Sequence, residues 1–317
     1  MTNKIKTIGL AAATLMFFAA LVITCKKGGD TSEIPDGTSS YWENDYRRNS
    51  LVDGVKTVTE WSEYDASDNR YRKLSFDQHG NLLEDAKYQN DILRDGLVFK
   101  HNAQNRITRC EYYASGNMSE FAEFTYGGAN SHNVYIPSNV FVDDLRLQKG
   151  ITGILYKLAD GDVVCDVKCN SVKGDQLIFS GKFGGKDCKL QIGTQGNYPA
   201  DMDLEVKNEK EKIATVSFDS NGVPTTLYSY INSSDLVVEY IVKEGFLAMI
   251  SQVTKDKKTG AIKDTYQYTY NEHGYLASEK YNGKLNYEYT YEYDVKGNWI
   301  KRNGDGYTLF REITYWN

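Results

Sequence analysis

A short unit recurs along the chain and constrains its fold more than any other feature. Each copy has an aromatic residue (His in one copy), Asx, two variable residues, Gly or Asn, one further residue, and an apolar residue that begins a new strand. Copies start at Phe76, His101, Phe218, Tyr270 and Tyr293, and a weaker copy runs from Tyr64 to Asn69. In such a unit the Asx side chain caps the turn, and Gly or Asn adopts the positive φ that reverses the chain. The repeat therefore predicts antiparallel hairpins.

Composition favours the same fold class. The chain has 25 Tyr and only 4 Pro, which suits half-buried pleated strands and long uninterrupted ladders. The dominant hydrophobic period is two. Helix is expected only as a turn within residues 33–54 and as one short helix over residues 145–158. We therefore predict an all-β protein.

Two histidines occupy a variable position of the repeating turn. His79 and His273 share this position with Gln104, Asn221 and Lys296 in the other copies. A catalytic or metal-binding role would require a particular side chain there. We therefore interpret both histidines as turn-surface residues.

A stripe of tyrosines near the C-terminus has two interpretations. Its members lie at alternate positions, and the residues between them are Glu or Thr. The tyrosines are Tyr287, Tyr289, Tyr291 and Tyr293. Since the polar face suits solvent, the tyrosine face is predicted to form a cross-strand structural ladder. The alternative is a ligand platform in which these tyrosines and Trp299 stack on sugar rings.

The repeats resemble a known family. The segments "FDQHGNLLEDAKY", "YNEHGYLASEKY" and "YDVKGNWIKR" resemble the YD repeats of Rhs proteins and of YD-repeat-like lipoproteins of the Bacteroidetes. The resemblance covers two blocks, near residues 60–128 and 213–317. It implies hairpins laid side by side in an extended, curling antiparallel sheet. Large Rhs proteins wrap such hairpins around a toxin, but the units here are too few for that shell, so only the architecture is expected to carry over.

The N-terminal residues predict export and lipid anchoring. Residues 1–24 have a basic start and an apolar run typical of a signal peptide. The run ends in Leu21-Val22-Ile23-Thr24-Cys25, which resembles the lipobox in which the cysteine is lipidated after cleavage. An uncleaved anchor helix and an ordinary signal with an incidental Cys25 are the alternatives. A lysine directly after the lipidated cysteine, here Lys26, resembles the pattern of lipoproteins sent to the outer membrane. The sequence does not indicate which leaflet of that membrane holds the lipid.

The rest of the chain divides by composition. Residues 25–40 are predicted to be a flexible tether, residues 41–128 a first repeat-like β block, residues 129–212 a central β segment, and residues 213–317 a second repeat-like β block. The central segment has alternating strands without the repeat unit. We expect its strands either to continue the repeat sheet or to pack on it, and the alternative is a separate small domain.

Four further cysteines permit disulfides in an exported chain. Cys165 and Cys169 lie on one predicted strand, about 13 Å apart, too far for a bond between them. Cys188 is the nearest partner for Cys165, and Cys110 is the fourth cysteine. The alternatives are buried free thiols and a zinc site, for which no His lies nearby.

No sequence motif predicts catalysis. Acid pairs occur at Asp143-Asp144 and at Asp201 and Asp203, but nothing indicates that either pair faces a substrate. We predict no enzymatic activity, no cofactor and no metal. The formal net charge is −6, and loss of Lys4 and Lys6 with the signal leaves 35 basic against 43 acidic residues, or −8. This acidity argues against nucleic acid as a partner.

Two functions from different classes fit these features. The first is a non-catalytic, lipid-anchored scaffold or protein-interaction protein of the cell envelope, attached to the outer membrane through its N-terminal lipid. The second is a glycan- or peptidoglycan-binding lipoprotein that uses exposed Tyr and Trp. Burial of the tyrosine stripe favours the first function, and its exposure favours the second.

Overall fold

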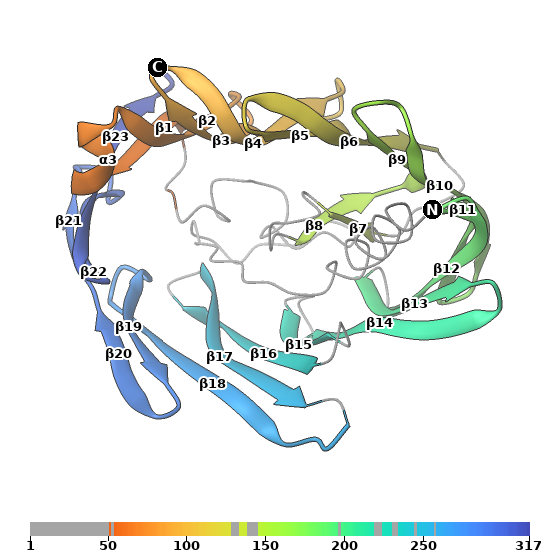
Figure 1. The fold of residues 1–317 in the computed structure, drawn as a ribbon. Coiled ribbons are helices and arrows are strands. Elements are labelled where there is room, and N and C mark those ends of the chain that lie inside the picture. The colour runs from red at the N-terminus through yellow and green to blue at the C-terminus, as the bar shows by residue number, and fades with distance from the viewer. Residues whose placement is uncertain are drawn as a thin grey trace.

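The computed structural model describes residues 51, 54–127, 133–137, 145–195, 198–218, 224–229, 234–243, 246–256 and 258–317. In these residues the regular structure is a 21-stranded antiparallel sheet, a two-stranded sheet and one short helix. Figure 1 shows the strands arranged around a ring, with the first strand beside the last. The prediction of an all-β fold formed by a curling antiparallel meander is confirmed.

The first repeat block forms six consecutive strands, each paired with the next. Their bounds are β1 Val55–Ser62, β2 Arg70–Phe76, β3 Leu82–Gln89, β4 Ile92–His101, β5 Ile107–Ala114 and β6 Asn117–Tyr126. Helix α3, Glu63–Ser67, lies between β1 and β2, where the weaker copy of the turn unit was expected. Ser62 Oγ accepts the backbone N–H of Asp65, and the Asp65 carboxylate accepts the N–H of Ser62. This capping box begins a helical turn in place of the repeating turn.

The central segment continues the sheet. Strand β9 pairs with β6 on one side and with β10 on the other, and the ladder then runs through β14. The bounds are β9 Ile151–Leu158, β10 Val163–Lys173, β11 Gln176–Phe183, β12 Lys186–Gln195, β13 Tyr198–Val206 and β14 Glu209–Phe218. Strands β7, Asn133–Pro137, and β8, Leu145–Lys149, form the separate two-stranded sheet, drawn inside the ring in Figure 1.

The helix expected over residues 145–158 is absent, because these residues form β8 and β9. The apolar residues of this segment suit both a helical and a strand period. Two neighbouring strands decide between them, since β6 and β10 take up the hydrogen-bonding groups on both edges of β9. The expected helical turn within residues 33–54 lies almost entirely outside the described residues.

The second repeat block completes the ring. Its strands are β15 Pro224–Ser229, β16 Ser234–Lys243, β17 Phe246–Asp256, β18 Ile262–Tyr270, β19 Leu276–Tyr281, β20 Lys284–Glu288, β21 Thr290–Tyr293, β22 Trp299–Gly304 and β23 Tyr307–Tyr315. Each pairs with the next except at one place, and β23 pairs with β1. Strands β20 and β21 follow one another along the chain with only Tyr289 between them, and no pairing joins these two described segments. The ladder of strand pairs is interrupted there.

The repeating unit closes its turns as predicted. The carboxylate or amide oxygen of Asx accepts the backbone N–H groups two and four residues later at Asp77, Asn102, Asn271 and Asp294. The reversing residue has positive φ in all four copies, from 59° at Asn105 to 88° at Gly297. The copy that follows Phe218 lies outside the described residues. We call the end of the ring that carries these turns the Asx rim.

The opposite end carries a different kind of turn. Because neighbouring strands are antiparallel, turns alternate between the two ends of the ring. Two-residue turns in which both residues have positive φ occur at 90–91, 115–116, 184–185, 207–208, 282–283 and 305–306. Such pairs are typical of type I′ hairpins, whose twist matches that of the strands. We call this end the tight-turn rim.

Bulges accompany the Asx turns and bend the sheet. The strand register shifts immediately before the last residue of the strand at Phe76, His101, Tyr126, Tyr270 and Tyr293. A bulge increases local twist and bends its strand. Register shifts also occur near the tight turns, at 87–88, 112–113 and 279–280, so bulges contribute to the curvature at both rims.

The core lies on the inner face of the ring. Buried side chains of β1 to β12 form one cluster that also includes Met249 of β17. Figure 1 places β17 across the ring from β3 to β5, so a cluster that contains both lies inside. The largest fully buried side chains include Phe76, Phe179, Leu177 and Ile192.

Substitution of Gly297 tests the turn geometry. Its φ is +88°, and a Cβ there would meet nothing within 4 Å, so the change to alanine alters only backbone conformation. We expect Gly297→Ala to lower the free energy of unfolding by about 1–2 kcal/mol, the cost of a left-handed non-glycine residue. Chemical denaturation measures it. Gly193, on β12 without a positive φ, is the control, because Gly193→Ala is expected to leave stability unchanged or to raise it by about 0.4–1 kcal/mol. Equal losses at both sites would contradict the assignment.

Candidate functional site

The predicted aromatic stripe is largely used by the fold itself. Trp299 is only 5% exposed and forms a small second core with Tyr275, against which Tyr291 and Tyr293 pack. The rings of Tyr291 and Tyr293 are stacked with centroids 6.1 Å apart. Tyr275 donates its hydroxyl to the carbonyl of Gly297, and burial raises its pKa to about 12. These contacts have the character of a structural ladder.

Exposure increases along the stripe toward the tight-turn rim. Tyr289 is half-buried, and the Arg302 guanidinium lies 5.1 Å from its ring centroid. Gly304 leaves room for that ring, because a Cβ at this position would collide with it. Tyr287 is 38% exposed. Of the five residues predicted as a ligand platform, Tyr287 alone presents an open ring.

A network of buried charges surrounds Trp299. Glu60 pairs with Arg72 and Arg311 in the strand register and shares their face of the sheet. Arg311 lies 3.6 Å above the indole centroid of Trp299, and its Nε donates to Glu60 at 2.9 Å. Arg72 donates twice to Asp85, at 2.7 Å each. Burial opposes the ionisation of Glu60, but the guanidinium groups of Arg311 and Arg72 outweigh it and hold its pKa below the ordinary value.

A groove of about 920 Å³ opens at the tight-turn rim, beside this network. Its walls come from the end of β1, helix α3, the start of β2, the end of β3, and the starts of β4 and β23. The residues that define it below are Tyr64, Arg70, Arg72, Lys87, Arg94 and Asp95. Tyr64 on α3 is 68% exposed. We call this groove the rim groove. It is large enough for a small ligand, and it combines an open aromatic ring with charged groups.

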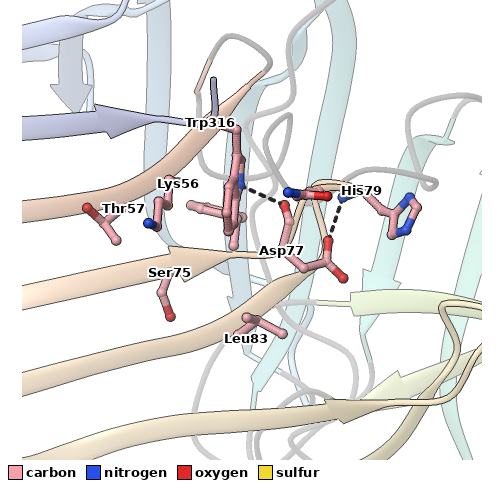
Figure 2. Close-up of a pocket in the computed structure, with 9 residues that line it drawn as sticks. Lys56, Thr57, Ser75, Asp77, His79, Leu83 and Trp316 are labelled. Atoms are coloured by element: carbon pink, nitrogen blue, oxygen red, sulfur yellow. Dashed lines mark hydrogen bonds between the residues drawn. The ribbon is translucent and has the colours of Figure 1, made fainter.

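A second hollow of about 430 Å³ lies at the Asx rim (Figure 2). The indole N–H of Trp316 donates to the carbonyl of Asp77 at 3.1 Å, and Lys56 Nζ lies 4.9 Å from the indole centroid. Figure 2 shows the His79 side chain on the far side of Asp77 from Trp316, so the titratable groups do not converge. His273 likewise sits on its turn, with its ring 4.4 Å from that of Tyr293.

The four cysteines within the described ranges are free thiols. Cys165 lies on β10 and Cys188 on β12, with β11 between them. Two strand spacings are about 9–10 Å, whereas a disulfide needs Cα atoms about 4.4–6.8 Å apart, so the expected Cys165–Cys188 bond is not formed. Burial raises the pKa of the Cys165 thiol to about 12 and also raises that of Cys188. Cys110 is buried as well.

Other predicted features are placed as follows. Cys25, the predicted lipidation site, and Asp143-Asp144 lie outside the described residues. Asp201 and Asp203 form ion pairs with Lys212 and Lys210. Across the described ranges, no helix is long and apolar enough to cross a bilayer. Nor does this part of the chain contain three or more His, Cys, Asp or Glu side chains grouped to hold a metal ion.

Sequence reasoning missed the charge network and the rim groove. Glu60 and Arg311 are 251 residues apart and meet only because β1 pairs with β23. The available signal was the alternation of charged residues on β2, where Arg70 and Arg72 share one face. Alternating charged residues are as typical of a strand that faces solvent as they are of a binding site.

Comparisons with known proteins give remote likenesses. No family model and no curated protein matches the chain. The TcdB2-TccC3-Cdc42 crystal structure aligns with 80% of this chain and 13% of its own, at 13% identity and a TM-score of 0.29. The Tc holotoxin pore of Photorhabdus luminescens aligns with 84% of this chain and 16% of its own, at 11% identity and a TM-score of 0.25. A porin-like protein from Bacteroides uniformis aligns over 82% of this chain and 98% of its own, at 12% identity and a TM-score of 0.26. The chain thus spans less than a fifth of the two toxin structures, and TM-scores this low establish no common overall fold.

Proposed function

We propose that this chain is a non-catalytic, lipid-anchored scaffold of the bacterial cell envelope that holds a partner protein. It is a YD-repeat-like lipoprotein in this proposal, attached to the outer membrane through Cys25. The sequence supports the anchor, since an apolar run ends directly at Cys25 and a polar tether follows. A diacyl or triacyl cysteine supplies enough buried methylene groups for firm attachment.

The burial of the aromatic stripe carries the scaffold proposal. Trp299 is 5% exposed, and its neighbours stack on one another, so these rings stabilise the sheet and are not available to a ligand. The pairing of β23 with β1 holds the two ends of the described fold together. A broad sheet held together in this way suits a protein that presents surfaces to a partner.

Glycan binding is the second candidate function, and the rim groove favours it. Tyr64 offers a flat ring at 68% exposure beside several charged side chains. Flat aromatic rings with hydrogen-bonding neighbours suit the faces and hydroxyl groups of sugars. This candidate moves the binding site from Trp299, where the sequence placed it, to the tight-turn rim.

Photocrosslinking in intact cells tests the proposal. With a photoreactive amino acid in place of Tyr64, we expect an adduct in the membrane fraction, and the mass added to the labelled peptide of this chain shows whether the partner is a protein or a glycan. The Cys25→Ser variant lacks the lipidated residue and is expected in the soluble fraction without the adduct. Val295, fully exposed in a turn at the Asx rim, is the matched position for unspecific labelling.

Three outcomes separate the candidates. An adduct specific to position 64 whose added mass is a peptide after proteolysis supports the protein-binding scaffold. One whose added mass is a sugar that glycoside hydrolases shorten supports glycan binding instead. Equal adducts at positions 64 and 295, or retention of Cys25→Ser in the membrane, would contradict the anchored scaffold.

A further inference from the structure

Cationic side chains gather on one wall of the rim groove. Arg72 on β2 lies opposite Lys87 on β3, and Lys87 lies opposite Asp95 on β4. Residues directly opposite in an antiparallel pair share a face, so Arg72, Lys87 and Asp95 form a row across three strands. Arg70 lies two residues from Arg72 on the same face, and Arg94 adjoins Asp95 at a shift in the register. Four cations therefore border a hollow in a chain whose net charge is −6.

Most of the opposite charge in the groove is already engaged. Glu60 accepts from Arg311, and Arg72 is held by Asp85. Asp65 is bound by Ser62 and lies 3.6 Å from Arg70, which also pairs with Asp68. These pairs neutralise one another and fix the walls of the groove.

Two cations are left without a counter-ion. Within the described part of the chain, no acidic side chain lies within ion-pair distance of Lys87 or Arg94. Arg94 Nε is buried and has no hydrogen-bond partner. The Arg94 side chain also lines the groove, so its guanidinium group is placed to meet an anion there. Asp95 accepts the backbone N–H of Ser115.

We propose that the rim groove binds an acidic saccharide, a sugar that carries a carboxylate or a phosphate group. Its oxyanion accepts from Lys87 and Arg94, and its hydroxylated body lies along Tyr64 and the polar wall. The inference rests on glycan binding as the function of this groove. An acidic peptide is the poorer match, because the groove offers Leu309 as its one aliphatic wall and so lacks pockets for peptide side chains.

Titration calorimetry with the full chain in detergent micelles tests this proposal. The probes are trigalacturonate, glucose 6-phosphate, neutral maltotriose and triglutamate. We expect trigalacturonate or glucose 6-phosphate to bind. Binding of trigalacturonate identifies the anion as a carboxylate, and binding of glucose 6-phosphate identifies it as a phosphate. Lys87→Gln and Arg94→Gln are each expected to weaken that binding about tenfold, the loss of one charge-assisted hydrogen bond. Lys87→Arg is expected to retain it, and raising salt from 50 to 200 mM is expected to weaken it.

Controls keep the outcome specific. Lys56→Gln, at the opposite rim, is expected to leave binding unchanged, and melting temperatures verify that every variant folds. Maltotriose or triglutamate binding as tightly as the acidic saccharides would overturn the inference, as would undiminished affinity in Lys87→Gln or the absence of binding by either acidic probe. A glycan adduct at Tyr64 without affinity for acidic probes would retain glycan binding and reject only its acidic class.

Discussion

Replacing Trp299 with alanine is expected to lower the free energy of unfolding by about 3–5 kcal/mol, the range found for large aromatic residues in cores. The indole is 5% exposed and fills the space between Arg311, Tyr275 and Tyr291. Removal of the indole leaves a cavity, and the guanidinium of Arg311 loses the aromatic ring over which it lies. Urea denaturation followed by circular dichroism gives the loss directly.

Tyr287 is the matched control for this prediction. It belongs to the same stripe but is 38% exposed. We expect Tyr287→Ala to change stability by less than about 1 kcal/mol, as for most surface positions. If Trp299→Ala were as stable as Tyr287→Ala, the ladder interpretation would be wrong and the rings would again be candidates for a ligand platform.

Removing the Glu60 carboxylate is expected to lower the free energy of unfolding by about 3–5 kcal/mol, because the buried positive charge of Arg311 then has no ion-pair partner. The side chain of Arg311 is 7% exposed, and Glu60 is its ion-pair partner. Glu60→Ala leaves this guanidinium without a counter-ion beside Arg72. Denaturant unfolding of the variant at pH 7 measures the effect.

The double variant Glu60→Met with Arg311→Met provides a stringent check. Replacing both members of a buried pair with apolar residues is often neutral or stabilising, so much of the loss is expected to be recovered. Glu292→Ala is the surface control, since Glu292 is 61% exposed and pairs with Lys301, and it is expected to cost less than about 1 kcal/mol. Failure of the double variant to recover stability would show that packing around Trp299, and not charge, governs this site.

The same pair predicts how stability depends on pH. The pKa of Glu60 is lowered in the folded protein. The stabilisation from its ionised form is therefore fully present above the pKa of an unfolded Glu and is lost as the pH falls through the lower folded value. Acid titration of Glu60→Ala should show a smaller loss of stability over that range than the wild-type chain shows.

The turns were the most predictable part of the fold, because their chemistry is local. The positive φ of Asn105 and the capping by Asp294 depend only on residues within the same turn. The segment over residues 145–158 was misjudged for the opposite reason, since its conformation depends on β6 and β10 as neighbours. Helix α3 shows that one local contact, the capping box at Ser62, can redirect a copy of the unit.

The candidate site was less predictable than the fold. Pairing of β1 with β23 creates the Glu60–Arg311 contact, and no local pattern contains information on strands that distant. Burial of Trp299 comes from nearer strands, because Arg311 on the paired strand β23 covers its ring and Tyr275 and Tyr291 pack against it. The tyrosine alternation predicted correctly that the stripe has one face, but which rings remain open depends on where neighbouring hairpins end.

Pairing of the first strand with the last has a consequence for how the chain matures. Strand β1 has one neighbour, β2, that is made soon after it, whereas β23 lies far along the chain, with Arg311 251 residues after Glu60. Until β23 exists, β1 presents an unpaired edge on which strands of other molecules can assemble. Contacts so distant along the chain also form slowly, because a long loop must close before they are gained. A molecule that loses β23 would therefore keep that edge of β1 open permanently, and we expect it to aggregate more readily than the intact chain.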